Sequence, residues 1–482
     1  MNKVKLLMSV LILCFSTQVI ADEYIVTIKG EQQRIALVRA KITPENGTLK
    51  MNEFNEHGLP EGWATYIEDV QAKDAEGKRL KVTPIENSQW RIEGYESGLV
   101  DLIYVAKLEH DRVEPALNGG DNGAAYAVDD GVMWAGRAIF LVGKDSNNIP
   151  IEFNLPESWK VTTQWMATEN PRKFVVEKTS DLVNSAFFAG AHKHQEVNSG
   201  NVSIRVALAG EYSKKISGDI VKKLSEYFDF YGKQYQSPLE ANMILVVSDS
   251  HYDGGEVMGN AISISMGPRM RKNGFNKSSA YVVAHEALHA FFLNQINIDD
   301  EKEDFTTYTW FNEGFAAEYG AHMAMLRTGT YNEADFLESL VSRMDKYTTK
   351  LDGNMNLITA GLDKFKNYHV VYCGGLIAAM ALDFHIRSET NGQKNLDELW
   401  QFLLKTFPLD GNTLTIPRLL ESVKEVYGEK TGALISDFVN SPQAIDFYQY
   451  TELMGLTFDG KALIVVTLKG PCLAFCHNPT YS

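Results

Sequence analysis

The chain has 482 residues, of which 44% are hydrophobic and 22% are charged. This composition is typical of a folded globular protein and excludes an intrinsically disordered one, and the length predicts two or three domains. The formal net charge of −16 disfavours nucleic acid and anionic membrane surfaces as partners.

Residues 1–21 have the pattern of a secretory signal peptide. Lys3 and Lys5 precede an apolar run, and Val19 and Ala21 have the small-residue spacing of a cleavage site. The apolar run is short for a membrane-spanning helix, and no later segment is predicted to be apolar enough to cross a bilayer. We therefore expect a periplasmic or extracellular protein without stable membrane insertion after signal cleavage.

Residues 22–200 have the pattern of a β-rich domain. Their apolar runs are short, and turns that contain Gly, Asn and Pro separate them. Examples are YIVTIKG, VDLIYVAKL, RAIFLVG and KFVVEKT. We therefore expect several strands that pack into a sandwich-like N-terminal domain ending near Gly200.

After Gly200 the apolar pattern lengthens into helical periods. The expected helices are at residues 214–235, 281–295, 311–327, 372–389, 395–407 and 416–428. Two strand-like segments interrupt them, at residues 242–249 and 260–267, and we expect the second at an edge of its sheet. This half divides into an α+β domain at 201–345 and a helical domain at 346–458, so the fold class of the whole chain is α+β.

A tail follows at residues 459–482 and contains two of the cysteines. Cys472 and Cys476 could form a disulfide in an oxidising compartment, or they could stay as two free thiols in a frayed tail. Both alternatives stay open.

The segment YVVAHEALHAFFLNQ contains the pattern that carries the chemistry. On a helix, His285 and His289 lie one turn apart on the same face, so both imidazoles can bind one metal ion. Glu286 follows the first histidine directly, and its carboxylate can reach a water molecule on the metal. Ser278 and Ser279 are candidate caps for this helix. These residues are sufficient for a hydrolytic zinc centre.

A third ligand decides whether the pattern is used in this way. Glu313 occurs in the segment TWFNEGFAAEYG, early in the next expected helix, which can pack against the first. Two imidazoles and one carboxylate leave the fourth position of a zinc ion open, which is the arrangement of a catalytic rather than a structural site. The sequence therefore predicts one catalytic Zn²⁺ per chain.

Other metal-binding patterns are weaker. His192 and His194 could bind a metal, but no third ligand accompanies them, so a solvated loop is favoured. The acidic run at residues 299–304 does not have the spacing of a calcium loop and is expected to be a surface loop. His322 is expected to support the site or the fold rather than to bind the metal.

The motifs HEALH and WFNEGFAAEY resemble those of the gluzincin peptidases, and within that group the chain is most similar to the glycyl aminopeptidase family. The similarity extends to GWATYIEDVQAKDAEGKRLKV in the β-rich half and to VVYCGGLIAAMALDFHIRSETNGQKNLDELW in the helical half. The resemblance implies that His285, His289 and Glu313 bind zinc and that Glu286 is the general base. It also implies that Tyr372 supplies a hydroxyl that stabilises the transition state.

The same resemblance implies a thermolysin-like catalytic domain at residues 201–345, followed by the helical part at 346–458. The sequence also departs from the family. Gly374 stands where a Lys or Arg is usual, and the chain after YTELMGLTFDGK is too short for the C-terminal PDZ domain that many members of the family carry.

A further departure concerns the residues expected to bind substrate. The family has a Gly-Gly-x-Glu-His strand along the substrate, and the nearest segment here is DGGEVMGNAISISM. Glu256 is one position early, and Met258 stands where histidine is common. Glu256 is nevertheless the best candidate for binding the substrate's free amino group, and Gly255 lets the backbone approach a ligand closely.

Together these observations predict a zinc-dependent peptidase whose partner is a peptide or protein substrate. We expect an aminopeptidase that prefers small N-terminal residues. The alternatives are an endopeptidase with the same zinc centre and a catalytically inactive secreted binding protein whose β-rich domain carries the function.

Overall fold

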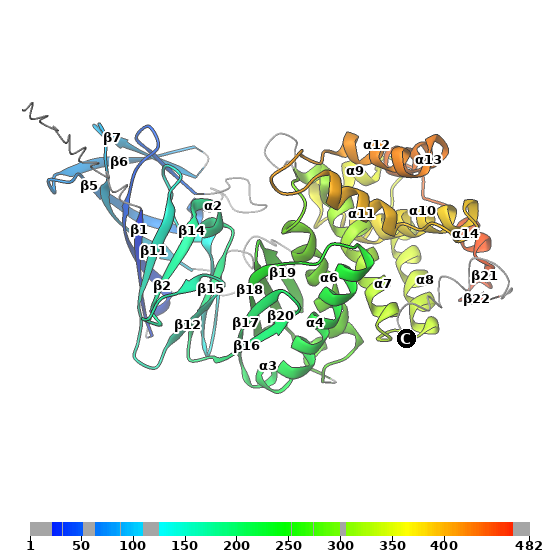
Figure 1. Ribbon diagram of the computed structural model, residues 1–482, viewed down its shortest axis with the longest axis horizontal. Coiled ribbons are helices and arrows are strands. Elements are labelled where there is room, and N and C mark those ends of the chain that lie inside the picture. Colours follow the sequence, from blue (N-terminus) through cyan, green and yellow to red (C-terminus); the bar gives the residue numbers. More distant parts are fainter. Residues whose placement is uncertain are drawn as a thin grey trace, which may run out of the picture.

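The computed structural model describes residues 22–30, 32–51, 63–86, 88–108, 125–251, 253–272, 274–298 and 305–465. The signal-like segment, the acidic run at 299–304 and the cysteine pair Cys472 and Cys476 lie outside the described residues. Figure 1 shows a β-rich domain, a central sheet with helices, and a helical part that follow one another along the longest axis.

The N-terminal domain is the expected sandwich of two sheets. In the described part of the chain, ten strands form the larger sheet and four form the smaller one. In spatial order the larger sheet contains β13 (Met166–Ala167), β14 (Lys173–Lys178), β11 (Asn147–Asn154), β1 (Glu23–Lys29), β2 (Gln32–Ile42), β8 (Val100–Lys107), β5 (Ile67–Lys73), β6 (Arg79–Ile85), β7 (Gln89–Glu93) and β3 (Thr48–Lys50). The smaller sheet contains β12 (Lys160–Thr163), β15 (Ala186–Gly190), β10 (Gly131–Ala135) and β9 (Ala125–Val128).

Alternation along the strands builds the core of this domain. In β1 the buried residues are Tyr24, Val26 and Ile28, and the residues between them are more exposed. This alternation with a period of two places one face of the strand against the core and the other towards solvent. The two sheets therefore share one hydrophobic core.

The segment RAIFLVG, which the apolar pattern suggested as a strand, has a different structure. It begins in the short 3-10 helix η2 (Gly136–Ala138) and continues as a buried loop. The hydroxyl groups of Tyr104 and Tyr24 donate hydrogen bonds to the carbonyl oxygens of Ile139 (2.8 Å) and Leu141 (2.9 Å). Two backbone hydrogen bonds between Val142 and Lys50 of β3 (2.8 Å and 2.9 Å) add one isolated bridge. Because these bonds and the tyrosine hydroxyls satisfy buried backbone groups, the segment can remain a loop.

A five-stranded sheet follows, in the order β16 (Lys193–Ser199), β17 (Val202–Ala209), β18 (Ala241–Asp249), β20 (Ala261–Met266) and β19 (Gly254–Met258). β16 and β17 form a hairpin around Gly200, so the boundary expected there falls in the turn between two paired strands. β20 is an inner strand, and the expectation that it forms the edge is wrong. The edge strand is β19, because the chain returns antiparallel to β20 on its outer side.

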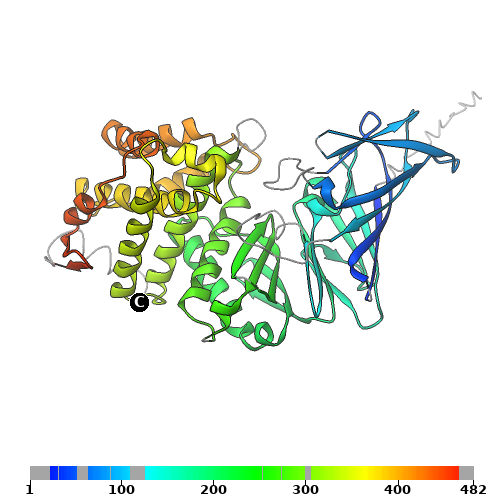
Figure 2. The same cartoon turned by 180° about the vertical axis from the view of Figure 1, so that it is seen from behind.

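This sheet is covered on both faces. Ala207, Ile244 and Val246 belong to the core of the N-terminal domain, whereas Leu208, Leu245 and Val247 pack with the helices. Such two-sided burial explains why the middle strands read as continuous apolar runs rather than alternating ones. In Figures 1 and 2 the sheet lies between the β-rich domain and the helices.

The remaining elements are helical, apart from the hairpin of β21 (Leu456–Phe458) and β22 (Leu463–Val465). Those as far as the boundary expected at 345, which falls inside the last of them, are η1 (Ala64–Tyr66), α2 (Thr179–Val183), α3 (Glu211–Lys215), α4 (Ser217–Gln234), α5 (Pro268–Arg271), α6 (Lys277–Leu293), η3 (Phe305–Tyr308), η4 (Trp310–Glu318), α7 (Tyr319–Arg327) and α8 (Glu333–Lys350). Those that follow are α9 (Leu357–Ala360), η5 (Gly361–Asp363), η6 (His369–Gly374), α10 (Gly375–Glu389), α11 (Asp397–Thr406), α12 (Ile416–Tyr427), α13 (Glu429–Asn440) and α14 (Phe447–Leu453).

One helix in the described part of the chain is long and apolar enough to cross a membrane, contrary to the expectation that no later segment would be. It covers His369–Glu389, that is η6 and α10. Within the fold, 89% of its most apolar stretch is buried. Its apolar character is therefore that of a helix surrounded by other helices in a protein core.

Candidate metal centre

Helix α6 positions the two histidines. Its first turn is capped by Asn276, whose side chain accepts hydrogen bonds from the backbone N–H groups of Ser278 (2.9 Å) and Ser279 (3.1 Å). The two serines were the expected caps, but they lie inside the helix and supply backbone donors instead. His285 and His289 follow on one face of α6, and each is 8% exposed.

The third candidate ligand lies on η4, a π-helix that packs against α6 and α10. Gly314 allows η4 to approach α10 closely, because a Cβ atom at this position would lie 2.6 Å from the Cα atom of Gly375. The preceding residue, Glu313, is buried and faces the histidines of α6. A π-helical segment of this kind is often found at functional sites.

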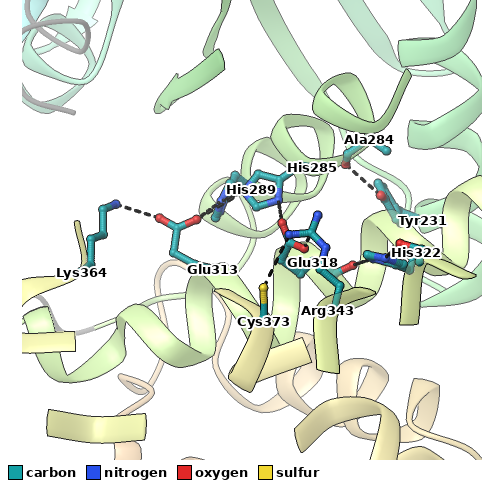
Figure 3. A network of polar contacts seen from close by, with 11 residues as sticks. Tyr231, Ala284, His285, His289, Glu313, Glu318, His322, Arg343, Lys364 and Cys373 are labelled. Carbon is teal, nitrogen blue, oxygen red and sulfur yellow. Dashed lines mark hydrogen bonds and ion pairs between the residues drawn. The ribbon is translucent and has the colours of Figure 1, made fainter. Parts of the chain in front are cut away.

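The three side chains converge on one point (Figure 3). The Nε2 atoms of His285 and His289 lie 3.0 Å apart, and Glu313 Oε2 lies 3.3 Å and 3.1 Å from them, respectively. Tetrahedral zinc with bonds of 2.0–2.1 Å separates its ligand atoms by about 3.3 Å. The donor atoms and their spacing therefore fit a zinc ion held by His285, His289 and Glu313.

A second carboxylate, that of Glu318, lies beside the Nδ1 atom of His285, the ring nitrogen that does not face the other two candidate ligands. Glu318 Oε1 lies 3.5 Å from His285 Nδ1, and its other oxygen lies 3.1 Å from Arg343 Nη2. A carboxylate behind a metal-binding histidine fixes the orientation of the ring. The guanidinium carbon of Arg343 also lies over the ring of Tyr281, 5.2 Å from the ring centroid. This cation–π contact holds the guanidinium beside Glu318.

The charges of the cluster favour a cation. Burial lowers the pKa of His285, but hydrogen bonds with Glu313 and Glu318 outweigh burial and raise this pKa to about 10. Burial raises the pKa of Glu318, yet Arg343 and His285 bring it down to about 2. The buried carboxylates thus stabilise positive charge at the point where the ligand atoms meet.

Glu286 lies beside the three ligands and is not one of them. Its carboxylate is 7% exposed, and burial raises its pKa to about 7, with Glu313 adding to the rise and His285 and Lys364 opposing it. A Cβ atom at Gly255 would lie 2.6 Å from Glu286 Cδ and Oε1. The edge strand β19 therefore packs its backbone directly on the Glu286 carboxylate.

This contact predicts a large effect of Gly255→Ala. The added methyl group must displace the Glu286 side chain. If Glu286 is the general base that the sequence predicts, hydrolysis should fall by about 10²-fold, as when a general base is misplaced. Zinc content should not change, because the three ligands are untouched. Steady-state kinetics with metal analysis checks both statements, and Gly218→Ala, whose Cβ atom would meet nothing within 4 Å, is the matched control. Unchanged activity in Gly255→Ala would contradict the contact.

Tyr372 lies on η6 and faces the same cluster. Its ring stacks on that of Tyr368 at 4.1 Å and lies 6.0 Å from the ring of His285. Burial and the nearby carboxylate of Glu313 raise the pKa of Tyr372 well above its ordinary value. The phenol therefore keeps its proton and can act as a hydrogen-bond donor beside the metal cluster.

Glu256 lies on β19 itself, with its side chain on the face opposite to Gly255. Alternation along the strand places Gly255 and Val257 towards α6, and Glu256 and Met258 towards the N-terminal domain. There Glu256 Oε1 lies 3.5 Å from Arg137 Nη2, with the two side chains 32% and 15% exposed, respectively. The shift of one position seen in the sequence has thus turned this carboxylate to the other face of the strand.

The remaining candidate histidines lie outside the metal cluster. His192 and His194 were expected in a solvated loop, and this expectation is wrong, because His192 is buried and His194 lies on β16. The Thr162 hydroxyl of β12 lies 2.7 Å from His192 Nε2 and 2.9 Å from His194 Nδ1, so the two rings share one polar contact. His322 Nδ1 donates to the carbonyl oxygen of Glu318, and its Nε2 lies 2.8 Å from Ser339 Oγ. His322 therefore supports the element that carries Glu318, as expected.

Four contributors were missed at the level of sequence, and one of them is Arg343, which pairs with Glu318. Glu318 follows Glu313 by five residues on the same helical segment, and this spacing was the available signal. Lys364, whose Nζ atom donates to Glu313 Oε1 at 2.9 Å, and Arg137, which pairs with Glu256, come from distant parts of the chain. No local pattern marks either of them.

Comparison with known proteins supports this architecture. A model of the peptidase M61 N-terminal domain matches residues 59–191, which is less than half of the chain. A search of curated protein sequences finds no significant match.

Solved structures share the fold at low sequence identity. An aminopeptidase N family protein from Idiomarina loihiensis is 15% identical with a TM-score of 0.76, and the alignment covers 90% of this chain and 78% of that one. An M1 zinc metallopeptidase from Deinococcus radiodurans is 12% identical with a TM-score of 0.56, and coverage is 88% and 94%. A mutant of the latter bound to a Tyr-Ser-Ala substrate is 13% identical with a TM-score of 0.53, and the alignment covers 88% of this chain and 95% of that one. These similarities establish the fold class predicted from the sequence.

Proposed function

We propose that the protein is a zinc-dependent peptidase. The observation that carries this proposal is the convergence of His285, His289 and Glu313, with the Glu286 carboxylate beside them and outside the ligand set. The match to a peptidase N-terminal domain and the fold shared with zinc metallopeptidases support the same conclusion.

The residues of this chain have separate roles in the proposed reaction. Zinc, when bound, would polarise the substrate carbonyl and make a water molecule more acidic. Glu286 accepts the proton of the attacking water and later donates it to the leaving amine, and a pKa near neutrality suits both steps. The Tyr372 hydroxyl donates a hydrogen bond to the oxyanion of the tetrahedral intermediate.

Tyr372→Phe tests the last of these roles. Removal of one oxyanion donor is expected to lower kcat by about 10²–10³-fold with little change in KM. Tyr448→Phe, in α14, is the matched control, and we expect it to leave kcat unchanged. Steady-state kinetics of the two variants decides the assignment, because an unchanged kcat in Tyr372→Phe would show that another group holds the oxyanion.

Within this class we propose an aminopeptidase. The edge strand β19 runs beside Glu286, so an extended peptide can add to it by main-chain hydrogen bonds. Glu256 is the candidate group for the α-ammonium, because it lies on this strand and its charge reaches Tyr372, whose pKa it helps to raise. The close packing at Gly255 leaves little room near Glu286, which is consistent with a small first residue.

A panel of peptides tests this specificity. We expect peptides with a free amino terminus and Gly or Ala first to be cleaved, and their acetylated counterparts to be resistant. Glu256→Ala should raise KM for the free peptides. Cleavage of doubly blocked peptides at internal bonds would instead establish an endopeptidase.

The endopeptidase is the second candidate, and one observation favours it. The Glu256 carboxylate already has a cationic partner in Arg137 and lies on the face of β19 away from Gly255. A peptide's α-ammonium must therefore share this carboxylate with the guanidinium. Under this alternative the zinc chemistry is unchanged, and only the preference for a free amino terminus is lost.

We also propose that the protein acts in the periplasm or outside the cell. The support is the charged and then apolar pattern of residues 1–21 with small residues before Asp22.

A further inference from the structure

The cationic side chain of Lys364 contacts the candidate zinc ligand Glu313 directly. Lys364 Nζ donates to Glu313 Oε1 at 2.9 Å, while the other oxygen, Oε2, faces both histidines. Figure 3 shows the lysine and the histidines on opposite sides of the carboxylate. The two oxygens of Glu313 therefore have different partners.

The contact is partly buried and its backbone is fixed. The Glu313 side chain is 9% exposed and that of Lys364 is 25% exposed. Lys364 follows η5, and Asn367 anchors this segment because its backbone N–H donates to Asp363 O (3.0 Å) and its side chain donates to Ala360 O (3.1 Å). An ion pair held in this way differs from a mobile pair at the surface.

We propose that Lys364 is a positioning residue that makes Glu313 a one-oxygen ligand of the metal. A carboxylate can bind a metal ion through one oxygen or through both. A charge-assisted hydrogen bond from Lys364 to Oε1 holds that oxygen away from the histidines and leaves Oε2 as the ligand atom. A position on the metal then stays open for water and substrate. This inference rests on the proposed zinc centre.

The alternative is that Lys364 only offsets the negative charge of a buried carboxylate. The two roles differ in what Lys364→Met does to the metal's coordination. If Lys364 positions Glu313, its removal frees Oε1 to bind as a second oxygen and raises the coordination number. If it only offsets charge, the coordination number stays the same.

The visible absorption of Co²⁺-substituted protein measures the coordination number, because four-coordinate Co²⁺ absorbs visible light more strongly than five-coordinate Co²⁺. We expect Co²⁺-loaded wild-type protein to show the strong absorption and Lys364→Met to lose much of it. Lys364→Arg, which keeps the charge and donor groups, should recover it. Lys366→Met, at an exposed lysine on the same segment, is the matched control and should resemble the wild type.

Kinetics of the zinc-loaded proteins supplies a second readout. Loss of a partner of a metal ligand typically lowers activity by about 10–100-fold, so we expect a decrease in kcat of this size in Lys364→Met at full zinc occupancy. A cobalt spectrum that Lys364→Met leaves unchanged would overturn the positioning role while the zinc centre stands. Failure of the wild-type protein to bind either metal would overturn the zinc centre itself.

Discussion

Glu286→Gln is expected to reduce peptide hydrolysis by about 10²–10⁴-fold, the usual contribution of a general base. Glutamine has nearly the same shape and can fill the same space against Gly255, but it cannot accept a proton from water. The variant should still bind one zinc per chain, because His285, His289 and Glu313 are intact. Metal analysis by inductively coupled plasma mass spectrometry, together with initial rates on the same sample, measures both properties.

The control for this experiment is Glu338→Gln, which makes the same chemical change at an exposed position of α8. We expect it to leave the rate unchanged. If Glu286→Gln retained near wild-type hydrolysis, Glu286 would not be the base, whatever its position beside the metal cluster.

The second large effect is expected from His289→Ala, which should lose both the metal and the activity. His289 contributes one of three ligand atoms, and its Nε2 lies within 3.1 Å of both of the others. With two ligands left, the zinc site is incomplete. We therefore expect no bound zinc after gel filtration and hydrolysis below detection.

Thermal unfolding separates loss of zinc from loss of fold. A ligand present at about 100 times its Kd stabilises the native state by about 2.7 kcal/mol, so added zinc should raise the Tm of the metal-free wild type. It should leave the Tm of His289→Ala unchanged, while the near-UV circular dichroism of this variant should still be that of a native fold. His251→Ala, at an exposed histidine after β18, should respond to zinc as the wild type does. A zinc-dependent rise in the Tm of His289→Ala would contradict the ligand assignment.

The residues that the structure brings together on α6 and η4 were predictable because helical geometry is local. A spacing of four places His285 and His289 on one face without reference to the rest of the fold. Glu313 required one further assumption, that the next helix packs against the first, and the apolar residues around both segments supported it. The convergence of His285, His289 and Glu313 could thus be predicted from the sequence down to individual side chains.

The substrate side of the site was less predictable, because it depends on how strands pair across the sheet. The segment at 260–267 is more apolar than that at 254–258, and it was predicted to be the edge strand to which an extended peptide could add. The pairing order makes it an inner strand and places β19 at the edge. Which face Glu256 occupies also follows from this register, since one position reverses the direction of a side chain.

Contacts between distant segments were not predictable. Lys364 lies 51 residues from Glu313 in the sequence, and Arg137 reaches Glu256 from the other domain. Likewise RAIFLVG has the composition of a strand, but tyrosine hydroxyls and one backbone bridge from Val142 to Lys50 satisfy its polar groups and make a buried loop possible. Only the folded structure shows which of these distant residues are in contact.

The most direct test of the zinc peptidase proposal is the hydrolysis of an alanine-initiated peptide before and after removal of the metal. Purified wild-type protein should contain about one zinc per chain, lose activity when a chelator removes the zinc, and regain it when a stoichiometric amount of Zn²⁺ is added. Hydrolysis that persists in protein free of zinc, or zinc-loaded protein that cleaves neither free nor blocked peptides, would contradict it.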